Sequence, residues 1–193
     1  MAFTQKYENK SDELKPANPD FNIVAAAYFD IAELGNALEP LEWQKNLELY
    51  KRVLSFDPNF YFADVVFYNI GYLSSTIEKN RIEQGLIAYE EKNIFSLTKP
   101  ENLRYSEAAY GEAINAYKAI VDNYPRSQYY SEALFRLGYL YFEIGTDAAR
   151  PVQYYETARS YYDRLISRPA DPYLYKALYQ RGWTWLNSNS EEA

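Results

Sequence analysis

Few side chains in this sequence could carry out chemistry, and their types exclude several kinds of site. The chain has no histidine and no cysteine, so Ser-His-Asp catalysis, cysteine nucleophiles, disulfides and histidine-based metal sites are excluded within it. The glycines occur singly and form no phosphate-binding loop. Adjacent acids occur at 90–91 and 191–192, but neighbouring helical residues point about 100° apart and usually form a solvated face. We therefore expect no enzymatic activity, no metal and no cofactor here.

The composition favours a protein partner over nucleic acid or a membrane. The net charge is −7 and the sequence pI is about 4.8, whereas nucleic acid and anionic membranes require clustered lysine and arginine. Residues 1–14 are polar and contain neither a signal-peptide core nor a membrane span. Tyrosine contributes 22 residues, and its amphipathic ring suits packed helix faces and binding grooves. We expect most of these rings to pack between helices, with no binding of nucleic acid and no direct membrane insertion.

One pattern recurs four times and organises the chain. A proline is followed thirteen residues later by a small residue inside an apolar segment, as in Pro19 and Ala32, Pro58 and Gly71, Pro125 and Gly138, and Pro169 and Gly182. Apolar spacing of three and four predicts an amphipathic helix in each copy. Each proline predicts the end of the preceding helix, because it lacks an amide hydrogen. Since glycine inside a helix costs about 1 kcal/mol relative to alanine, we expect another helix to pass too close for a side chain.

Two positions within these copies carry further expectations. Ser131 with Glu132 is the predicted start of the third copy's helix. Arg181 stands where the other copies have isoleucine or leucine. This charge indicates either that the last unit is incompletely covered or that it meets a polar neighbour.

A second amphipathic segment follows each of the first three copies, at 41–56, 103–123 and 152–167. Matching positions in these segments are Asn46, Tyr50 and Val53, then Ala113, Tyr117 and Ile120, then Ala158, Tyr162 and Leu165. Two helices per unit, with alternating small and aromatic residues before a proline, resemble the tetratricopeptide repeat of about 34 residues. The resemblance implies an all-α, right-handed solenoid of antiparallel helix pairs.

The repeat pattern divides the chain into a segment at 1–18 and an array at 19–193. We interpret 1–18 as the end of an upstream repeat. The array comprises repeats at 19–58, 59–125 and 126–169 and a partial repeat at 170–193. Because the chain stops where a second helix would start, we expect a fragment of a longer repeat protein.

The second repeat exceeds the usual length and contains an insertion at 77–102. One interpretation is an extended or extra short helix over 80–92, followed by a loop that breaks at Pro100. The other is a degenerate repeat that has lost a helix. Long loops are often functional, so a partner-binding arm is one hypothesis for this segment. The stretches 35–40 and 145–151 each run from glycine to proline and are predicted to be turns, with the glycine past one helix and the proline starting the next.

In stacked helix pairs the first helix of each pair lines a concave surface. The resemblance places the partner-binding residues at Phe29, Asp30, Tyr68, Asn69, Tyr72, Phe135, Arg136, Tyr139, Tyr179, Gln180 and Trp183. Such an aromatic groove with few polar points suits a peptide or protein partner, extended or helical. The alternative is that several of these rings only pack between repeats.

The sequence around Pro125 resembles one group of tetratricopeptide repeat proteins in particular. Residues 124–129, Tyr-Pro-Arg-Ser-Gln-Tyr, and the helix that follows resemble repeats of bacterial envelope proteins, such as the outer-membrane lipoprotein of the β-barrel assembly machinery and the periplasmic coordinator of the Tol-Pal system. This resemblance implies a scaffold in the periplasm or at the outer membrane; cytosolic relatives make a cytoplasmic location the alternative. The other functional interpretation is a spacer within a larger protein, with any activity in another domain.

Overall fold

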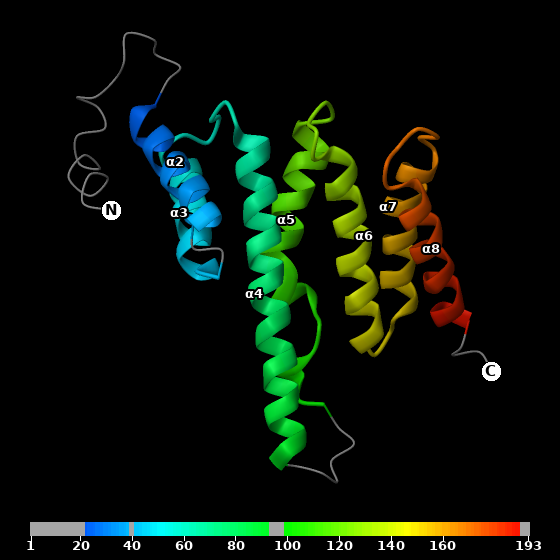
Figure 1. The fold of residues 1–193 in the computed structure, drawn as a ribbon. Coiled ribbons are helices and arrows are strands. Elements are labelled where there is room, and N and C mark those ends of the chain that lie inside the picture. The colour runs from blue at the N-terminus through cyan, green and yellow to red at the C-terminus, as the bar shows by residue number, and fades with distance from the viewer. Residues whose placement is uncertain (1–21, 39–40, 93–98, 190–193) are drawn as a thin grey trace.

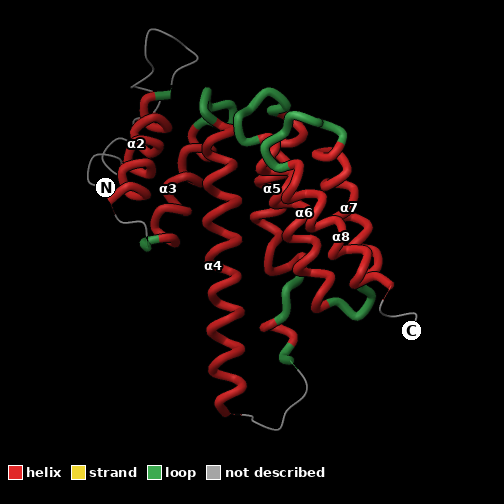
Figure 2. The backbone as a smooth tube through the Cα atoms, turned by 45° about the vertical axis from the view of Figure 1, so that its right-hand side comes forward, coloured by secondary structure: helices red, strands yellow, loops and turns green. Residues whose placement is uncertain are grey.

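The chain is all α-helical throughout the part that the computed structural model describes, which is residues 22–38, 41–92 and 99–189 (Figures 1 and 2). The helices are α2 (Ile23–Leu38), α3 (Trp43–Phe56), α4 (Ala63–Lys92), α5 (Glu107–Asn123), α6 (Tyr130–Asp147), α7 (Val152–Ile166) and α8 (Leu174–Asn189), with one 3-10 turn, η1 (Glu101–Leu103). The 1–18 segment and Pro19 lie outside the described residues.

The helices pack consecutively, each against the next one along the chain. In Figure 1, α4 lies in front of α5 and α8 lies in front of α7. We call α2, α4, α6 and α8 the first helices and α3, α5 and α7 the second helices. This arrangement confirms the expected all-α solenoid of helix pairs. None of the described helices is long and apolar enough to cross a membrane.

Two glycines inside the first helices lie directly beneath tyrosine rings of the second helices. A Cβ at Gly71 would lie 2.7 Å from Cε1 of Tyr117, and one at Gly138 would lie 2.5 Å from Cε1 of Tyr162. Both tyrosines are completely buried. The expectation that another helix passes too close for a side chain is therefore confirmed at these two positions. Gly182 differs, because nothing lies within 4 Å of its Cβ position.

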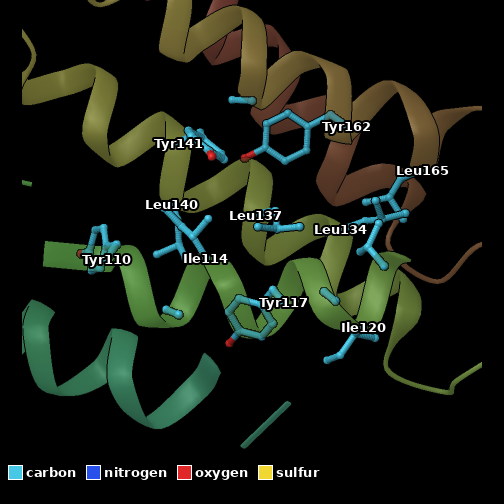
Figure 3. Packing of buried hydrophobic residues seen from close by; sticks show 14 of the residues in the cluster. Tyr110, Ile114, Tyr117, Ile120, Leu134, Leu137, Leu140, Tyr141, Tyr162 and Leu165 are labelled. Atoms are coloured by element: carbon cyan, nitrogen blue, oxygen red, sulfur yellow. The ribbon is translucent and has the colours of Figure 1, made fainter. Parts of the chain in front are cut away.

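The buried residues form two apolar clusters that share neighbours. One cluster lies among α2, α3 and α4 and includes Tyr50 and Val53. The other lies among α5 to α8 and includes Leu137 and Tyr162 (Figure 3). Phe67 packs against both clusters, so the core continues along the array.

The second helices end just before the prolines, as predicted. α3 ends at Phe56, α5 at Asn123 and α7 at Ile166. The predicted start of α6 was wrong in detail: the helix begins at Tyr130, and the hydroxyl of Ser131 donates to the carboxylate of Asp171 instead of capping its own helix. Side chains cap two other helices: Oδ1 of Asn22 accepts from the Val24 and Ala25 amides at the start of α2, and the hydroxyl of Ser106 accepts from the Ala109 amide of α5 at 3.2 Å.

Gly35 and Gly145 were wrongly predicted to lie past helix ends. Both lie inside helices, α2 and α6, and no described glycine has a positive φ. A Cβ at Gly145 would lie 2.6 Å from Cε1 of Tyr155, and one at Gly35 would collide with the Asn46 side chain. These glycines therefore allow close packing rather than a turn.

The insertion extends an existing helix. α4 continues without a break over 30 residues to Lys92, which matches the extended-helix interpretation as far as the chain is described; residues 93–98 lie outside it. The chain returns through η1, whose Leu103 packs against Gly85 of α4. Arg81 of α4 donates to the Asn102 carbonyl at 3.0 Å. One side of the lower half of α4 thus packs against its own return segment rather than against a second full helix (Figure 1).

The close contact at Gly138 yields a direct prediction. Gly138→Ala should lower stability by about 1–3 kcal/mol, because the new methyl group overpacks the ring of Tyr162. Gly182→Ala is the matched control. It should be neutral or stabilise by up to about 1 kcal/mol, because alanine favours helix and meets no neighbour. Urea denaturation followed by circular dichroism measures both, and equal stability of the two variants would contradict the packing explanation.

Candidate functional site

The predicted binding residues occupy three positions of the repeat, defined relative to the small residue of each first helix. Three residues before it lie Phe29, Tyr68, Phe135 and Tyr179, which we call the inner row. Two residues before it lie Asp30, Asn69, Arg136 and Gln180, the polar row. One residue after it lie Tyr72, Tyr139 and Trp183, the aromatic row, with Glu33 at the same position of α2.

The inner row mostly packs between units. Its first three members are only partly exposed, and each meets an aromatic ring from the turn before the next first helix. The ring centroids are 5.5 Å apart for Phe29 and Phe62, 4.3 Å for Tyr68 and Tyr129, and 5.4 Å for Phe135 and Tyr173. For these three residues the structure therefore favours the packing interpretation.

The three partner rings of the inner row were missed by the sequence reasoning. Phe62, Tyr129 and Tyr173 each lie four residues after the proline of their repeat. That spacing was a usable signal, but it falls in the turn between helices, where the apolar periodicity is interrupted. Tyr179 lies in the last first helix, and its ring is 62% exposed, with the ring of Trp183 next to it at 6.2 Å.

The polar row lies along the first helices with differing exposure. Asp30 is exposed, whereas Asn69, Arg136 and Gln180 are partly buried. Asn69 donates to the Val65 carbonyl at 3.0 Å and accepts from Asn36 at 3.4 Å. The guanidinium of Arg136 lies 5.6 Å from the centre of the Tyr72 ring, which joins the polar row to the aromatic row.

Two members of the aromatic row are well exposed. Tyr72 is 41% and Trp183 is 43% exposed. Tyr139 is partly buried, and its hydroxyl lies 3.3 Å from Nζ of Lys79. Rings at one repeated position of α4, α6 and α8 therefore present apolar surface with a hydroxyl or an indole nitrogen that can reach a ligand.

Glu132 connects α4 and α6 through a cluster of hydrogen bonds. Its Oε1 accepts from the Tyr68 hydroxyl at 2.9 Å and from Nη2 of Arg136 at 3.0 Å. Burial alone would raise the pKa of Glu132, but the hydrogen bonds from Arg136, Tyr173 and Tyr68 outweigh it and lower the pKa. Burial, together with Glu132, raises the pKa of Tyr173 to about 12.

A second polar cluster lies between α4 and α6, where Lys79 and Glu143 form an ion pair. Glu143 is buried and also accepts from the Tyr110 hydroxyl at 2.9 Å. Burial would lower the pKa of Lys79, but Glu143 more than compensates and raises it. Lys79 belongs to the 77–102 insertion, so the extended helix contributes directly to this face. The sequence reasoning did not anticipate this role.

A recess of about 240 Å³ opens beside this ion pair. Residues from three helices line it: Ser75, Thr76 and Lys79 of α4, Tyr110 and Tyr117 of α5, and Arg136, Tyr139, Leu140 and Glu143 of α6. Two of the predicted binding residues, Arg136 and Tyr139, thus border a hollow large enough for one side chain. Hydroxyl groups and paired charges line this space.

A larger cavity, of about 1050 Å³, lies away from the predicted residues. It is bordered by the extended half of α4, by η1, and by the turn between α6 and α7. Two ion pairs involve residues that line it: Glu78 lies 2.8 Å from Arg81, and Asp147 lies 2.5 Å from Lys99. Among the described residues no group of acids, histidines or cysteines could hold a metal ion.

Part of the chain matches a known protein family. The tetratricopeptide repeat family model matches residues 132–169, which cover most of α6 and all of α7. A search of curated proteins gives no match to the chain. The fold is thus a tetratricopeptide-like solenoid, and repeats of this family generally mediate protein–protein interactions and are generally non-catalytic.

The lowered pKa of Glu132 predicts an acid-sensitive contribution to stability. A carboxylate with a depressed pKa in the folded state stabilises the protein above its unfolded pKa, and this contribution is lost as the pH falls through the folded value. At pH 7 the Glu132→Gln substitution should therefore lower the free energy of unfolding by about 1–3 kcal/mol. It should also lose less stability than the unmodified protein as the pH falls below the usual value of 4.5.

Urea titrations at a series of pH values measure this effect. The matched control is Glu156→Gln, because Glu156 is exposed on α7. The stability of this variant should depend on pH in the same way as that of the unmodified protein. Parallel pH curves for Glu132→Gln and the unmodified protein would contradict the role of Glu132.

The ion pair at the recess yields a separate prediction. Lys79→Met should destabilise the protein by about 1–3 kcal/mol, because it leaves the buried carboxylate of Glu143 without its cation. Adding Glu143→Leu should recover part of that loss, since replacing both partners of an ion pair by apolar groups is often nearly neutral, while the buried Tyr110 hydroxyl loses its acceptor. A double-mutant cycle measured by urea denaturation tests this, and additive losses would mean that the two side chains are not coupled.

Proposed function

We propose that this chain is a non-catalytic scaffold that binds a protein or peptide partner along the face of its first helices. The observation that carries the proposal is the aromatic row. Tyr72, Tyr139 and Trp183 share one repeat position on α4, α6 and α8, and two of these rings are more than two-fifths exposed. Accessible aromatic rings at regular intervals are effective anchors for a partner, because they bury large areas with little loss of conformational entropy.

The neighbouring polar groups support binding in a defined orientation. The polar row runs beside the anchors, and Arg136 belongs to both the row and the recess. A partner side chain that enters the recess would meet hydroxyl groups and the paired charges of Lys79 and Glu143. At the α2 end, Asp30 and Glu33 are exposed acids, which favour basic residues in the part of the partner that lies there.

The proposed setting is an assembly in the bacterial cell envelope, in the periplasm or at the outer membrane. The support for it is the resemblance of residues 124–129 and the helix after them to repeats of envelope proteins. In the structure these residues form the turn into α6, in which the Tyr129 amide donates to the Ser127 hydroxyl at 3.1 Å. A cytoplasmic location is the alternative setting.

A structural spacer is the second candidate function. The observation that favours it is the inner row, where Phe29, Tyr68 and Phe135 are used for packing between units. A protein whose repeats only contact one another needs those contacts but gains nothing from exposed rings on α4 and α8. The two functions therefore differ in what the aromatic row does.

Removing the anchors distinguishes the two functions. Tyr72→Ala combined with Trp183→Ala should weaken partner binding by at least about tenfold for each ring that acts as an anchor. Folding should hardly change, because both rings are substantially exposed. Tyr68 and Arg136 are poorer probes, since they also support the Glu132 cluster.

The measurement is affinity capture from bacterial envelope extract, followed by identification of the retained protein and titration with it. Tyr61→Ala, an exposed ring in the turn before α4, is the control and should bind as well as the unmodified chain. Equal capture by the double variant would exclude the aromatic row as the site. The absence of any specifically retained protein would support the spacer function.

A further inference from the structure

The recess between α4, α5 and α6 suits a polar ligand. All of the described residues that line it, except Leu140, have a polar side chain. An apolar group that entered the recess would cover these side chains without forming hydrogen bonds, which costs free energy. The volume of about 240 Å³ is large enough for one side chain of a partner. We therefore looked for the polar group that the recess would bind best.

The charges in the recess are balanced by partners that the chain itself supplies. Lys79 forms an ion pair with Glu143, and Nη2 of Arg136 lies 3.0 Å from the carboxylate of Glu132. An incoming carboxylate would compete with these two acids, and an incoming cation would compete with the two basic side chains. The recess therefore favours a group that is polar and uncharged.

The hydroxyl of Tyr117 is buried and has no hydrogen-bond partner among the described residues. Tyr117 lines the recess, and its ring points toward α4, where it lies over Gly71 (Figure 3). Burial raises the pKa of Tyr117, while the neighbouring Arg136 and Ser75 side chains act in the opposite direction. A buried hydroxyl without a partner destabilises the fold, and phenylalanine would avoid that cost. The Tyr117 hydroxyl is thus available to a ligand in the recess.

The equivalent tyrosine of the first helix pair shows which groups satisfy such a hydroxyl. Tyr50 donates to a carboxylate, Oε1 of Glu33, at 2.6 Å and accepts from a carboxamide, Nδ2 of Asn36, at 2.8 Å. In α4 a tyrosine and a serine occupy the places of these two residues. The described residues that line the recess include a carboxylate but no carboxamide. A carboxamide is therefore the group that Tyr117 lacks.

We propose that the recess binds the carboxamide side chain of a glutamine or asparagine in the partner. A carboxamide is uncharged, its carbonyl oxygen accepts hydrogen bonds and its NH₂ group donates them. Nε and Nη2 of Arg136 both donate to Glu132, so the remaining nitrogen, Nη1, supplies a donor for the carbonyl oxygen. The NH₂ group donates to the Tyr117 hydroxyl, as Asn36 does to Tyr50. This inference rests on the proposed function, since it specifies which residue the partner places between α4 and α6.

The test uses model compounds in place of the partner. N-acetylglutamine N-methylamide is titrated into the full chain and followed by NMR at the Nε–H group of Arg136 and the backbone amides of Ser75 and Tyr139. The titration extends to about 100 mM, because ligands of this size bind at about the millimolar level. We expect saturable shifts. The glutamate analogue, which is charged, and the methionine analogue, which has no side-chain amide, should bind at least about fivefold more weakly.

The Tyr117→Phe variant separates binding from folding. It removes only the hydroxyl, so it should weaken binding of the glutamine compound at least about fivefold, while the urea concentration at half-unfolding stays the same or rises. Tyr50→Phe is the matched control. It should lower that urea concentration, because Glu33 and Asn36 lose their hydrogen-bond partner, and it should leave binding unchanged.

Three outcomes would overturn the inference. The absence of saturable shifts would mean that the recess binds no carboxamide. Binding of the glutamate or methionine compound as tight as that of the glutamine compound would remove the carboxamide as the recognised group. Destabilisation by Tyr117→Phe would mean that the hydroxyl has a role in folding. The variant with Tyr72→Ala and Trp183→Ala tests the proposed function separately, since neither residue lines the recess, so the failure of one idea is distinguishable from the failure of the other.

Discussion

The ring of a buried tyrosine over a glycine is the contact on which the rest of the array depends. Tyr117 over Gly71 and Tyr162 over Gly138 bring a first and a second helix within a distance that any side chain would prevent. The rings are fully buried, and burial raises the pKa of Tyr162. Because the contact occurs in both α4 and α6, it fixes the rotation of these two first helices and therefore which of their residues face outward.

Close packing at the glycines leaves the polar groups between α4 and α6 partly shielded from water. Glu132 and Glu143 each sit where two or more donors meet, from α4 as well as from α5 or α6. Such clusters are costly when incomplete and fix a single arrangement when satisfied. The extension of α4 contributes by placing Lys79 against Glu143, and the return segment through η1 covers the part of α4 that lies below α5.

Residues at the same repeat position differ in what lies against them. Phe135 is covered by Tyr173 of the next unit, while Tyr179, its counterpart on α8, is largely exposed. The aromatic row is different, because Tyr72 lies inside the array and remains accessible. This contrast separates rings that hold the units together from rings that are available to a partner.

The sequence by itself determined the helix pairs, the ends of the second helices at the prolines, and the reason for glycine at 71 and 138. These features are local or repeat at a fixed interval, so spacing alone reveals them. The sequence also indicated the residues of the polar and aromatic rows as candidate binding residues. Only the tertiary structure decided that Gly35 and Gly145 serve packing, that α4 continues through the insertion, and that Lys79 meets Glu143 across 64 residues. It also showed that Phe29, Tyr68 and Phe135 face neighbouring rings. Such outcomes depend on which surfaces meet in space, and a sequence period records the order of helices but not the contacts that their packing creates.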